Sequence, residues 1–369
     1  TDMFKRILLL ILSMAFLNSC SSSSSTDTPI ITDTFDRTEM LINIADNIII
    51  PATKDFADKL TILKTAGNDF TSAPNQTKLN FFRTSWINAY KVWQQIEMFD
   101  IGKAEELQYK FYMNIYPLTV ADVEANVSSG NYDLNNVNYQ DAQGFPALDY
   151  LLFGLADSDA EIIEKYTTDA KATGYKKYVN DVLNQMDGLT QQVVLDWDTY
   201  RNTFVNSTSN TATSAVNKLV NDYIFYFEKG LRANKFGIPA GNFSTNPLPE
   251  KVEAFYNKEI SKELALESLN AVTNFFKGIG YNSLNAGESF STYLISLERT
   301  DIKEQIISQL NAAKTQINSL DANFYNQVIF DNTKMTLSFD ELQKVVILLK
   351  VDMLQAFNIN VDYVDADGD

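Results

Sequence analysis

The chain of 369 residues carries 30 Lys and Arg against 47 Asp and Glu, for a formal net charge of −17, and it contains no histidine. This charge repels phosphate backbones and excludes nucleic acid as a partner. The absence of histidine excludes Ser-His-Asp catalysis, two-histidine zinc sites and haem ligation by histidine. Catalysis is left to carboxylates, Lys, Tyr or Ser. Any bound metal ion would have to be a hard one held by oxygen atoms, and no other cofactor is expected.

The N-terminal residues 1–19 predict a secretory signal peptide. Lys5 and Arg6 form a short basic region, and an apolar stretch from Ile7 to Leu17 leads to Cys20. The stretch is too short to span a bilayer, which takes about 20 apolar residues. Because it ends at a cysteine, it resembles a lipoprotein signal, and we expect Cys20 to carry the lipid. Cys20 is the only cysteine, so the lipidated chain has no thiol chemistry.

Residues 20–34 predict a flexible tether between the lipid and the folded body. Serines occupy positions 21–25, directly after Cys20, and such a run cannot bury apolar surface. We expect a cell-envelope protein with its lipid in the outer membrane and its body in the periplasm. The residues after Cys20 are serines rather than an acidic patch, which favours the periplasmic face of the membrane over the cell surface. An uncleaved signal anchor and a buried Cys20 are the alternatives.

Apolar residues recur every three to four positions in the first half of the body, which predicts helices. The first periodic stretch runs from Leu41 to Phe70, with a kink expected at Pro51. The polar residues 128–143 predict a loop. The other expected elements are residues 79–97, ended by Gly102; 111–127, with a break near Pro117; the apolar run 147–156; and a long helix over 175–204.

The Asn-, Ser- and Thr-rich residues 206–213 predict a domain boundary. After a helix over 216–229, Gly and Pro predict a loop through Gly241. Amphipathic segments are then expected over 249–256, 261–277, 289–297, 301–320 and 338–357. The predicted fold is therefore all-α, with two domains resembling four-helix bundles, residues 35–209 and residues 210–369.

Two carboxylates occupy positions where the helical pattern calls for apolar residues. Glu97 shares a face with Trp86, Tyr90 and Trp93, and Asp149 interrupts the apolar run 147–156. A buried, ionised carboxylate needs a cation, hydrogen-bond donors or a metal, or it takes up a proton. Each is either part of a functional site or half of a salt bridge or cap that fixes the packing.

A third segment, residues 230–243, places Arg232 and Lys235 between glycines in a strongly acidic chain. Arginine presents a rigid fork of donors that suits carboxylates. We hypothesise that Arg232 or Lys235 neutralises Asp149 or Glu97 across the interface of the two halves. Glu253 is a further candidate, although it also fits a solvated helix position.

These segments resemble the imelysin family, and in particular its lipoprotein members. The similar segments are residues 86–104, 144–154, 230–244, 252–256 and 351–369. The resemblance implies two helical bundles with a site between them, in the cell envelope. The family is named for insulin-cleaving membrane peptidases, and other members are linked to iron-regulated uptake. Its Gly-x-His-x-x-Glu motif, associated with metal binding, corresponds here to Gly144, Pro146 and Asp149, so the histidine is a proline and the acid is shortened.

The proline bears on function because its side chain cannot ligate a metal. We therefore expect a non-catalytic lipoprotein that binds a small ligand or an envelope protein between its bundles, with an iron- or nutrient-uptake setting implied by the resemblance. The alternatives are a peptidase that uses carboxylates and a hard metal, and a purely structural envelope protein. Glu97, Asp149, Arg232, Lys235 and Glu253 are the expected site residues, with Asp149 and Glu97 as the candidates for any metal.

Overall fold

The computed structural model describes residues 33–363. Cys20, the expected signal peptide and most of the expected tether lie outside these residues. The described part is helical, and its one β feature is an isolated antiparallel bridge between Ile279 and Ala286. The predicted all-α fold is confirmed. No helix in the described range is both long and apolar enough to cross a membrane.

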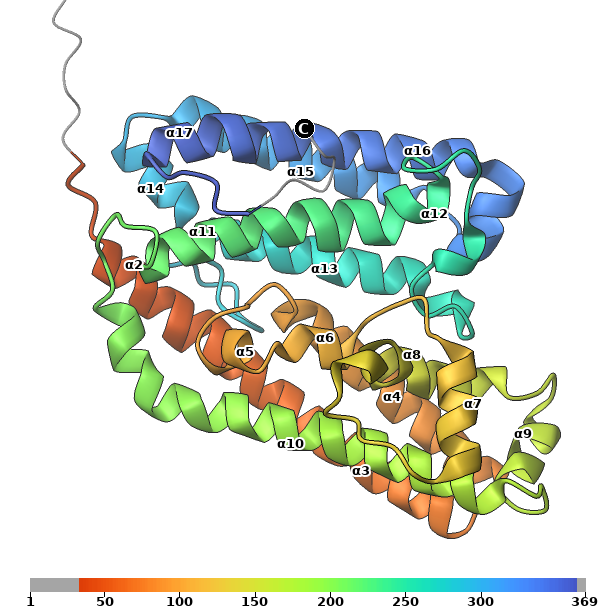
Figure 1. Ribbon diagram of the computed structural model, residues 1–369. Coiled ribbons are helices and arrows are strands. Elements are labelled where there is room, and N and C mark those ends of the chain that lie inside the picture. Colours follow the sequence, from red (N-terminus) through yellow and green to blue (C-terminus); the bar gives the residue numbers. More distant parts are fainter. Residues whose placement is uncertain (1–32, 364–369) are drawn as a thin grey trace, which may run out of the picture. The chain divides into compact units, whose positions relative to one another are not determined.

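Three long antiparallel helices, α3, α4 and α10, form the first group (Figure 1). Their apolar stripes face one another, and the Asn75 side chain caps the start of α4 by accepting a hydrogen bond from the Lys78 backbone. The irregularity expected at Pro51 is a π-helical stretch just before it, and Pro51 is the second residue of α3. The bounds are α2 (Arg37–Asn43), η1 (Ile44–Ile49), α3 (Ile50–Ser72), α4 (Gln76–Ile96) and α10 (Ala172–Val205).

Short elements between α4 and α10 cover one side of this group. Gly144 begins α8 with φ of +70°, and a Cβ there would lie 2.2 Å from the Met113 carbonyl oxygen, so only glycine lets α8 approach α6 this closely. The Trp86 indole donates to the Phe145 carbonyl at 3.2 Å and ties α8 to α4. The bounds are α5 (Lys103–Glu106), α6 (Tyr109–Met113), α7 (Val120–Ser129), η2 (Val137–Ala142), α8 (Gly144–Asp149), η3 (Tyr150–Gly154) and α9 (Asp159–Lys165).

The second group follows the connection at residues 206–214 and lies above the first in Figure 1. Helix α16 packs against both α15 and the π-helical η4, and α13 packs against α15. The bounds are α11 (Ala215–Phe225), η4 (Tyr226–Gly237), α12 (Ile238–Ala240), η5 (Pro249–Lys251), η6 (Lys258–Ile260), α13 (Ser261–Lys277), α14 (Phe290–Ser296), α15 (Thr300–Asn318), α16 (Phe324–Ile347), η7 (Leu348–Met353) and α17 (Leu354–Phe357).

Residues 230–240, which we expected to be a loop, are helical. The helix begun by α11 continues through η4 to the end of α12. Glycine costs about 1 kcal/mol of helix propensity, but the Tyr226 ring occupies the space where a Gly230 side chain would project. Leu231 and Phe236 are fully buried. Tertiary packing therefore outweighs local propensity in this segment.

Residues 249–256, which we expected to be a helical segment, are a short 3₁₀ turn followed by irregular backbone. Ala254 has φ of +56°, outside the helical region. Val252, Glu253 and Ala254 are nevertheless buried. Tertiary contacts, rather than helical hydrogen bonds, hold this segment in place, and it is referred to below as the 252–257 loop.

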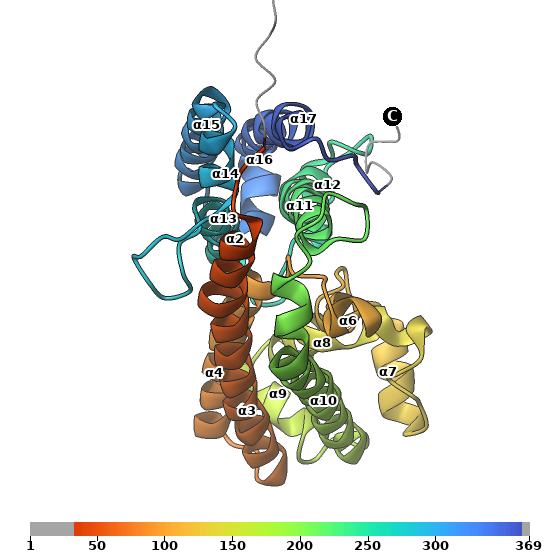
Figure 2. The same ribbon diagram turned by 90° about the vertical axis from the view of Figure 1, so that its left-hand side faces the viewer.

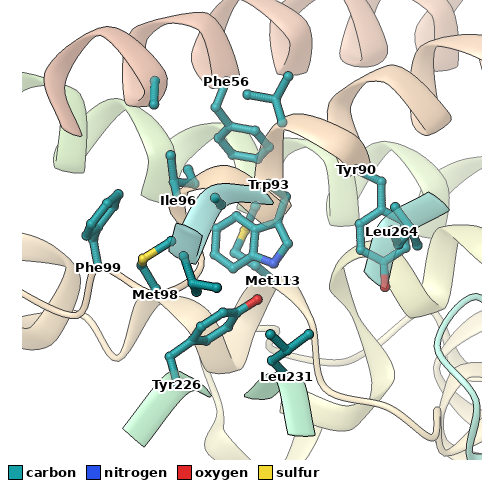
Figure 3. Close-up of a cluster of buried hydrophobic side chains, with 14 of the residues drawn as sticks. Phe56, Tyr90, Trp93, Ile96, Met98, Phe99, Met113, Tyr226, Leu231 and Leu264 are labelled. Atoms are coloured by element: carbon teal, nitrogen blue, oxygen red, sulfur yellow. The ribbon is translucent and has the colours of Figure 1, made fainter. Parts of the chain in front are cut away.

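Both groups contribute to one continuous core. Helix α4 of the first group packs against α13 of the second, and Figure 2 shows the second group's helices nearly end-on above the first. Figure 3 shows Trp93 between Phe56 of α3 on one side and Tyr226 and Leu231 of η4 on the other. The connection at residues 206–214 coincides with the predicted boundary, and the independence of the two domains stays a prediction.

Candidate functional site

A buried ion pair lies at the junction of the two groups. The Lys235 side chain of η4 and the Glu253 side chain of the 252–257 loop are 2% and 3% exposed, and their N and O atoms are 2.5 Å apart. Lys235 Nζ also donates to Gln94 Oε1 at 2.8 Å, and Gln94 Nε2 donates to Glu253 Oε1 at 3.1 Å. Ser268 donates to the same Gln94 oxygen. Both charges are thus hydrogen-bonded as well as paired, which a buried ion pair requires.

Asn114, which follows α6, links this pair to Glu97. Its Nδ2 donates to Glu253 Oε1 at 2.9 Å and to Glu97 Oε1 at 2.8 Å. Its Oδ1 accepts from the Tyr90 hydroxyl at 2.6 Å. The Tyr226 hydroxyl donates to Glu97 Oε2 at 3.0 Å. Helices α4 and η4 therefore meet through one polar network, in which Lys235 pairs with Glu253 and Asn114 connects Glu253 to Glu97.

Burial and two neighbouring charges set the protonation behaviour of Glu97. Burial raises the pKa of the Glu97 carboxyl, the positive charge of Lys235 opposes that rise, and the Glu253 carboxylate adds to it. The hydrogen bond from Asn114 favours the ionised form but does not cancel the effect of burial. A further positive charge or hydrogen-bond donor beside Glu97 would therefore stabilise its ionised carboxylate.

Asp149 has a different role from Glu97. Its two carboxylate oxygens accept the backbone N–H groups of Tyr256 and Asn257, each at 2.8 Å. The residue is 2% exposed, and burial raises its pKa to about 7 although both hydrogen bonds favour ionisation. Asp149 thus fastens the 252–257 loop, which carries Glu253, to the end of α8.

The donor set at this position does not fit a metal. Pro146 offers no ligating side-chain atom, and both Asp149 oxygens are directed at backbone donors. In residues 33–363 no group of three or more His, Cys, Asp or Glu side chains is arranged to hold a metal ion. At the motif position itself, Gly144, Pro146 and Asp149 do not present a set of side-chain ligands for the metal that the resemblance implied.

Two cavities flank this network, and Tyr116 lines both. One, of about 210 Å³, lies against Glu97 and is enclosed by the end of α4, residues 110–116, α11 and the start of η4. The other, of about 180 Å³, lies against Asp149 and the 252–257 loop. We call them the Glu97 cavity and the Asp149 cavity. Both are smaller than typical small-molecule sites, which measure about 300–1,000 Å³, so either would hold only a small ligand.

The Glu97 cavity combines charges of both signs with aromatic rings. Asp222 lines it, and burial, reinforced by the nearby Asp100, raises the pKa of Asp222 to about 8, with Lys110 opposing the rise. Lys110 forms an ion pair with Asp100 at 2.6 Å. The Oδ2 atom of Asp222 is buried without a hydrogen-bond partner in the described part of the chain. The other residues that line the Glu97 cavity include Lys229, Phe111, Tyr116, Phe225 and Tyr226.

The structure brings together three of the five expected site residues: Glu97, Lys235 and Glu253. Lys235 pairs with Glu253 rather than with Glu97 or Asp149, although its charge opposes the rise in the pKa of Glu97 that burial causes. Arg232 makes no ion pair with Glu97 or Asp149; it lies 3.6 Å from Glu228 on its own helix. Neither cation forms an ion pair with Glu97 or Asp149, and Lys235 influences Glu97 only through its charge.

Several groups of this site escaped the sequence reasoning. Gln94 lies one turn after Tyr90 on the face that also carries Glu97, so its spacing was a usable signal. Asn114 and Tyr116 lie in an irregular connection, and Asp222 falls in a helix where an exposed position was equally plausible. Their proximity depends on the crossing of the two groups, for which the sequence gives no local signal.

Comparison with known proteins agrees with this architecture. The imelysin family model matches residues 49–349, while no curated protein matches the sequence. The fold is similar to that of an imelysin-like protein from Psychrobacter arcticum 273-4, with a TM-score of 0.70 and 18% identity over 90% of this chain and 100% of that chain. It is also similar to a protein described as an iron-regulated protein A precursor from Parabacteroides distasonis ATCC 8503, with a TM-score of 0.72 and 17% identity over 88% of this chain and 96% of that chain. Because the family model spans most of the sequence, the chain belongs to the imelysin family.

Proposed function

We propose that this imelysin-family protein binds a small ligand in the Glu97 cavity and does not cleave peptides. The observation that carries the proposal is the pair of carboxyl groups, Glu97 and Asp222, that face one cavity with raised pKa values. Carboxyl groups held in this way at an enclosed cavity are a recurrent mark of binding sites. The cavity lies where the two helical groups meet, so both contribute to recognition.

The lining indicates the chemistry of the ligand. An amine or another cationic donor would compensate Glu97 and satisfy the Asp222 oxygen. Phe111, Phe225 and Tyr226 offer apolar surface beside these carboxyl groups. A small organic amine with an aromatic or apolar portion fits both features, and Lys229 could face an anionic group on the same molecule.

The contacts of the acidic side chains favour binding over hydrolysis. Both Asp149 oxygens accept hydrogen bonds from backbone N–H groups, and the Glu253 oxygens accept hydrogen bonds from Lys235, Gln94 and Asn114. A general base needs an oxygen within reach of the proton that it removes. In this proposal the protein is a receptor whose body lies in the periplasm and whose lipid on Cys20 holds it to the membrane. The iron-regulated neighbour from Parabacteroides distasonis motivates an uptake setting.

Calorimetric titration of the full-length protein in detergent tests the proposal, with tyramine as the cationic probe and 4-ethylphenol as the matched probe without the amine. Tyramine should bind more tightly than 4-ethylphenol. Asp222→Asn should weaken tyramine binding by at least about tenfold, because a charge-assisted hydrogen bond contributes roughly 1.5–3 kcal/mol. Asp198→Asn, at an exposed position of α10, is the matched control and should leave binding unchanged.

The alternative functions predict other outcomes. A structural protein would bind neither probe and would carry no small molecule when purified from its own membrane. A peptidase would cleave a peptide such as the insulin B chain, and cleavage would be lost with a chelator or in Asp149→Asn. Either result would replace the binding proposal.

A further inference from the structure

A third and larger cavity lies on the opposite face of α4. Tyr90, Gln94 and Glu97 face the polar network, whereas Asn88 and Gln95 face a groove of about 630 Å³. Its walls are the first turns of α3, the last turns of α4, helix α13 and the loop at residues 278–288. Figure 2 shows this loop projecting to the left of the helices, away from α6, α7 and α8 on the right. The groove is thus separate from the Glu97 cavity, and its volume is typical of ligand sites, about 300–1,000 Å³.

Carboxamide side chains dominate the polar lining of the groove. A carboxamide offers donors and an acceptor side by side. Asn88 and Asn274 are exposed, and in residues 33–363 their side chains make no hydrogen bond. The five lining carboxamides are those of Asn88, Gln95, Asn270, Asn274 and Asn282.

The charged groups of the groove compensate one another. Asp55 lies 3.2 Å from Lys59 and accepts the Tyr281 hydroxyl. Glu267 accepts a hydrogen bond from Gln95 at 2.8 Å, and Lys91 pairs with Glu263 at the rim. With Glu263 at the rim included, two lysines lie near three acids, so the groove is close to neutral in a chain whose net charge is −17. Such a lining favours a neutral ligand over an ionic one.

Apolar surface forms the floor. Val92, Phe99 and Phe275 are buried side chains whose edges line the groove, and the half-buried Tyr281 ring stands at its wall. A neutral ligand with hydroxyl groups around its edge and C–H groups on its faces would satisfy both parts of the lining. Sugar rings have this construction, because each presents adjacent hydroxyl donors and acceptors around an apolar face.

The wall formed by residues 278–288 is held in place before any ligand binds. Asn43 Nδ2 donates to the carbonyl oxygens of Gly278 and Glu288, each at 3.0 Å. The Tyr281 N–H donates to the Asn47 carbonyl oxygen at 2.7 Å. A wall ordered in advance lowers the entropy cost of binding.

We propose that this groove binds a neutral, polyhydroxylated ligand, namely a short oligosaccharide. An extended peptide is the less suitable occupant, because peptides that bind by strand addition need unpaired backbone groups. In the wall, the Gly280 N–H already donates to the Asn285 carbonyl oxygen at 3.0 Å, and the other walls are helices. The inference is independent of the proposed function of the Glu97 cavity, since no residue lines both.

The test is isothermal titration of the full-length protein with maltotetraose, cellotetraose, xylotetraose and chitotetraose, and with tetra-alanine as the peptide probe. The detergent must carry no sugar headgroup. We expect at least one tetrasaccharide to bind and tetra-alanine not to bind. The double variant Asn88→Leu/Asn274→Leu should weaken the binding by about fivefold or more, since it removes two neutral hydrogen bonds at about 0.5–1.5 kcal/mol each.

Asn311→Leu is the matched control, because Asn311 is an exposed carboxamide on α15 outside the groove. It should bind the sugar as the unchanged protein does, and melting curves should show that all variants fold. The proposal is overturned if no tetrasaccharide binds, if the double variant binds as well as the control, or if tetra-alanine competes for the groove. Loss of sugar binding in Glu97→Gln would also contradict it, since Glu97 does not line the groove.

Discussion

Replacing Lys235 by methionine removes the positive charge from the most buried ion pair of the site. Both side chains are almost inaccessible, at 2% and 3% exposure, so water cannot solvate the carboxylate that remains on Glu253. Breaking a buried pair from one side costs about 3–5 kcal/mol. The free energy of unfolding should fall by this amount, which is a large part of the roughly 5–15 kcal/mol typical of a folded protein. Urea unfolding followed by tryptophan fluorescence measures the change.

Two further variants make this prediction specific. Lys344→Met breaks a surface pair of similar geometry, 2.6 Å from Glu341 with Lys344 56% exposed, and should cost no more than about 0.5 kcal/mol. Glu253→Gln added to Lys235→Met removes the stranded charge and should restore at least about 1 kcal/mol. The reasoning is refuted if Lys235→Met costs as little as Lys344→Met, or if the double variant is no more stable than the single one.

The remaining predictions concern Asp149 and two glycines. Burial raises the pKa of Asp149 from 3.8 to about 7, so between these values the folded state binds more protons than the unfolded state, and ionisation lowers stability as pH rises. The loss of stability is at most roughly 4 kcal/mol. The free energy of unfolding should differ less between pH 5 and pH 8 in Asp149→Asn than in the unchanged protein. An equal difference in both would contradict the raised pKa of Asp149. Gly144→Ala should lower the melting temperature, because the φ of +70° alone costs about 1–3 kcal/mol and the new Cβ would meet the Met113 carbonyl. Gly188→Ala, in open space on α10, should instead stabilise the protein by about 0.5–1 kcal/mol, and a loss there would show that helix propensity does not govern that site.

The helical fold was predictable where periodicity and end signals agree. The expected segment 261–277 has the same bounds as α13, because Leu264, Leu269 and Val272 repeat on one face and Gly278, with φ of +70°, ends the helix. The segment after Gly230 was wrongly expected to be a loop. Glycine signals a break in an isolated helix, whereas here buried neighbours and the Tyr226 ring decide the conformation.

The site was predictable only in part, for a related reason. Glu97 stood out because a carboxylate on a face of aromatic residues conflicts with burial, a conflict that one helix reveals by itself. Glu253 gave no such signal, because a regular helix would have placed it in solvent. Its burial follows from the left-handed Ala254 and from the two backbone groups that Asp149 holds. The choice of partner for Lys235 depends on that loop, so local pattern could not assign it.

The core shared by the two helical groups has a consequence for ligand exchange. Trp93 lies between Phe56 of one group and Tyr226 of the other (Figure 3), and the Lys235–Glu253 pair lies at the same junction. A clamshell opening about a hinge would expose this core and separate two buried charges, so it is a costly way to admit a ligand. Displacement of the irregular residues 115–118, which include Tyr116, would open the Glu97 cavity without breaking that core or the hydrogen bonds of Asn114. Loop motions of this kind take nanoseconds to microseconds, whereas hinge motions take microseconds to milliseconds. Association with the cavity should therefore be gated by a local flap and be fast.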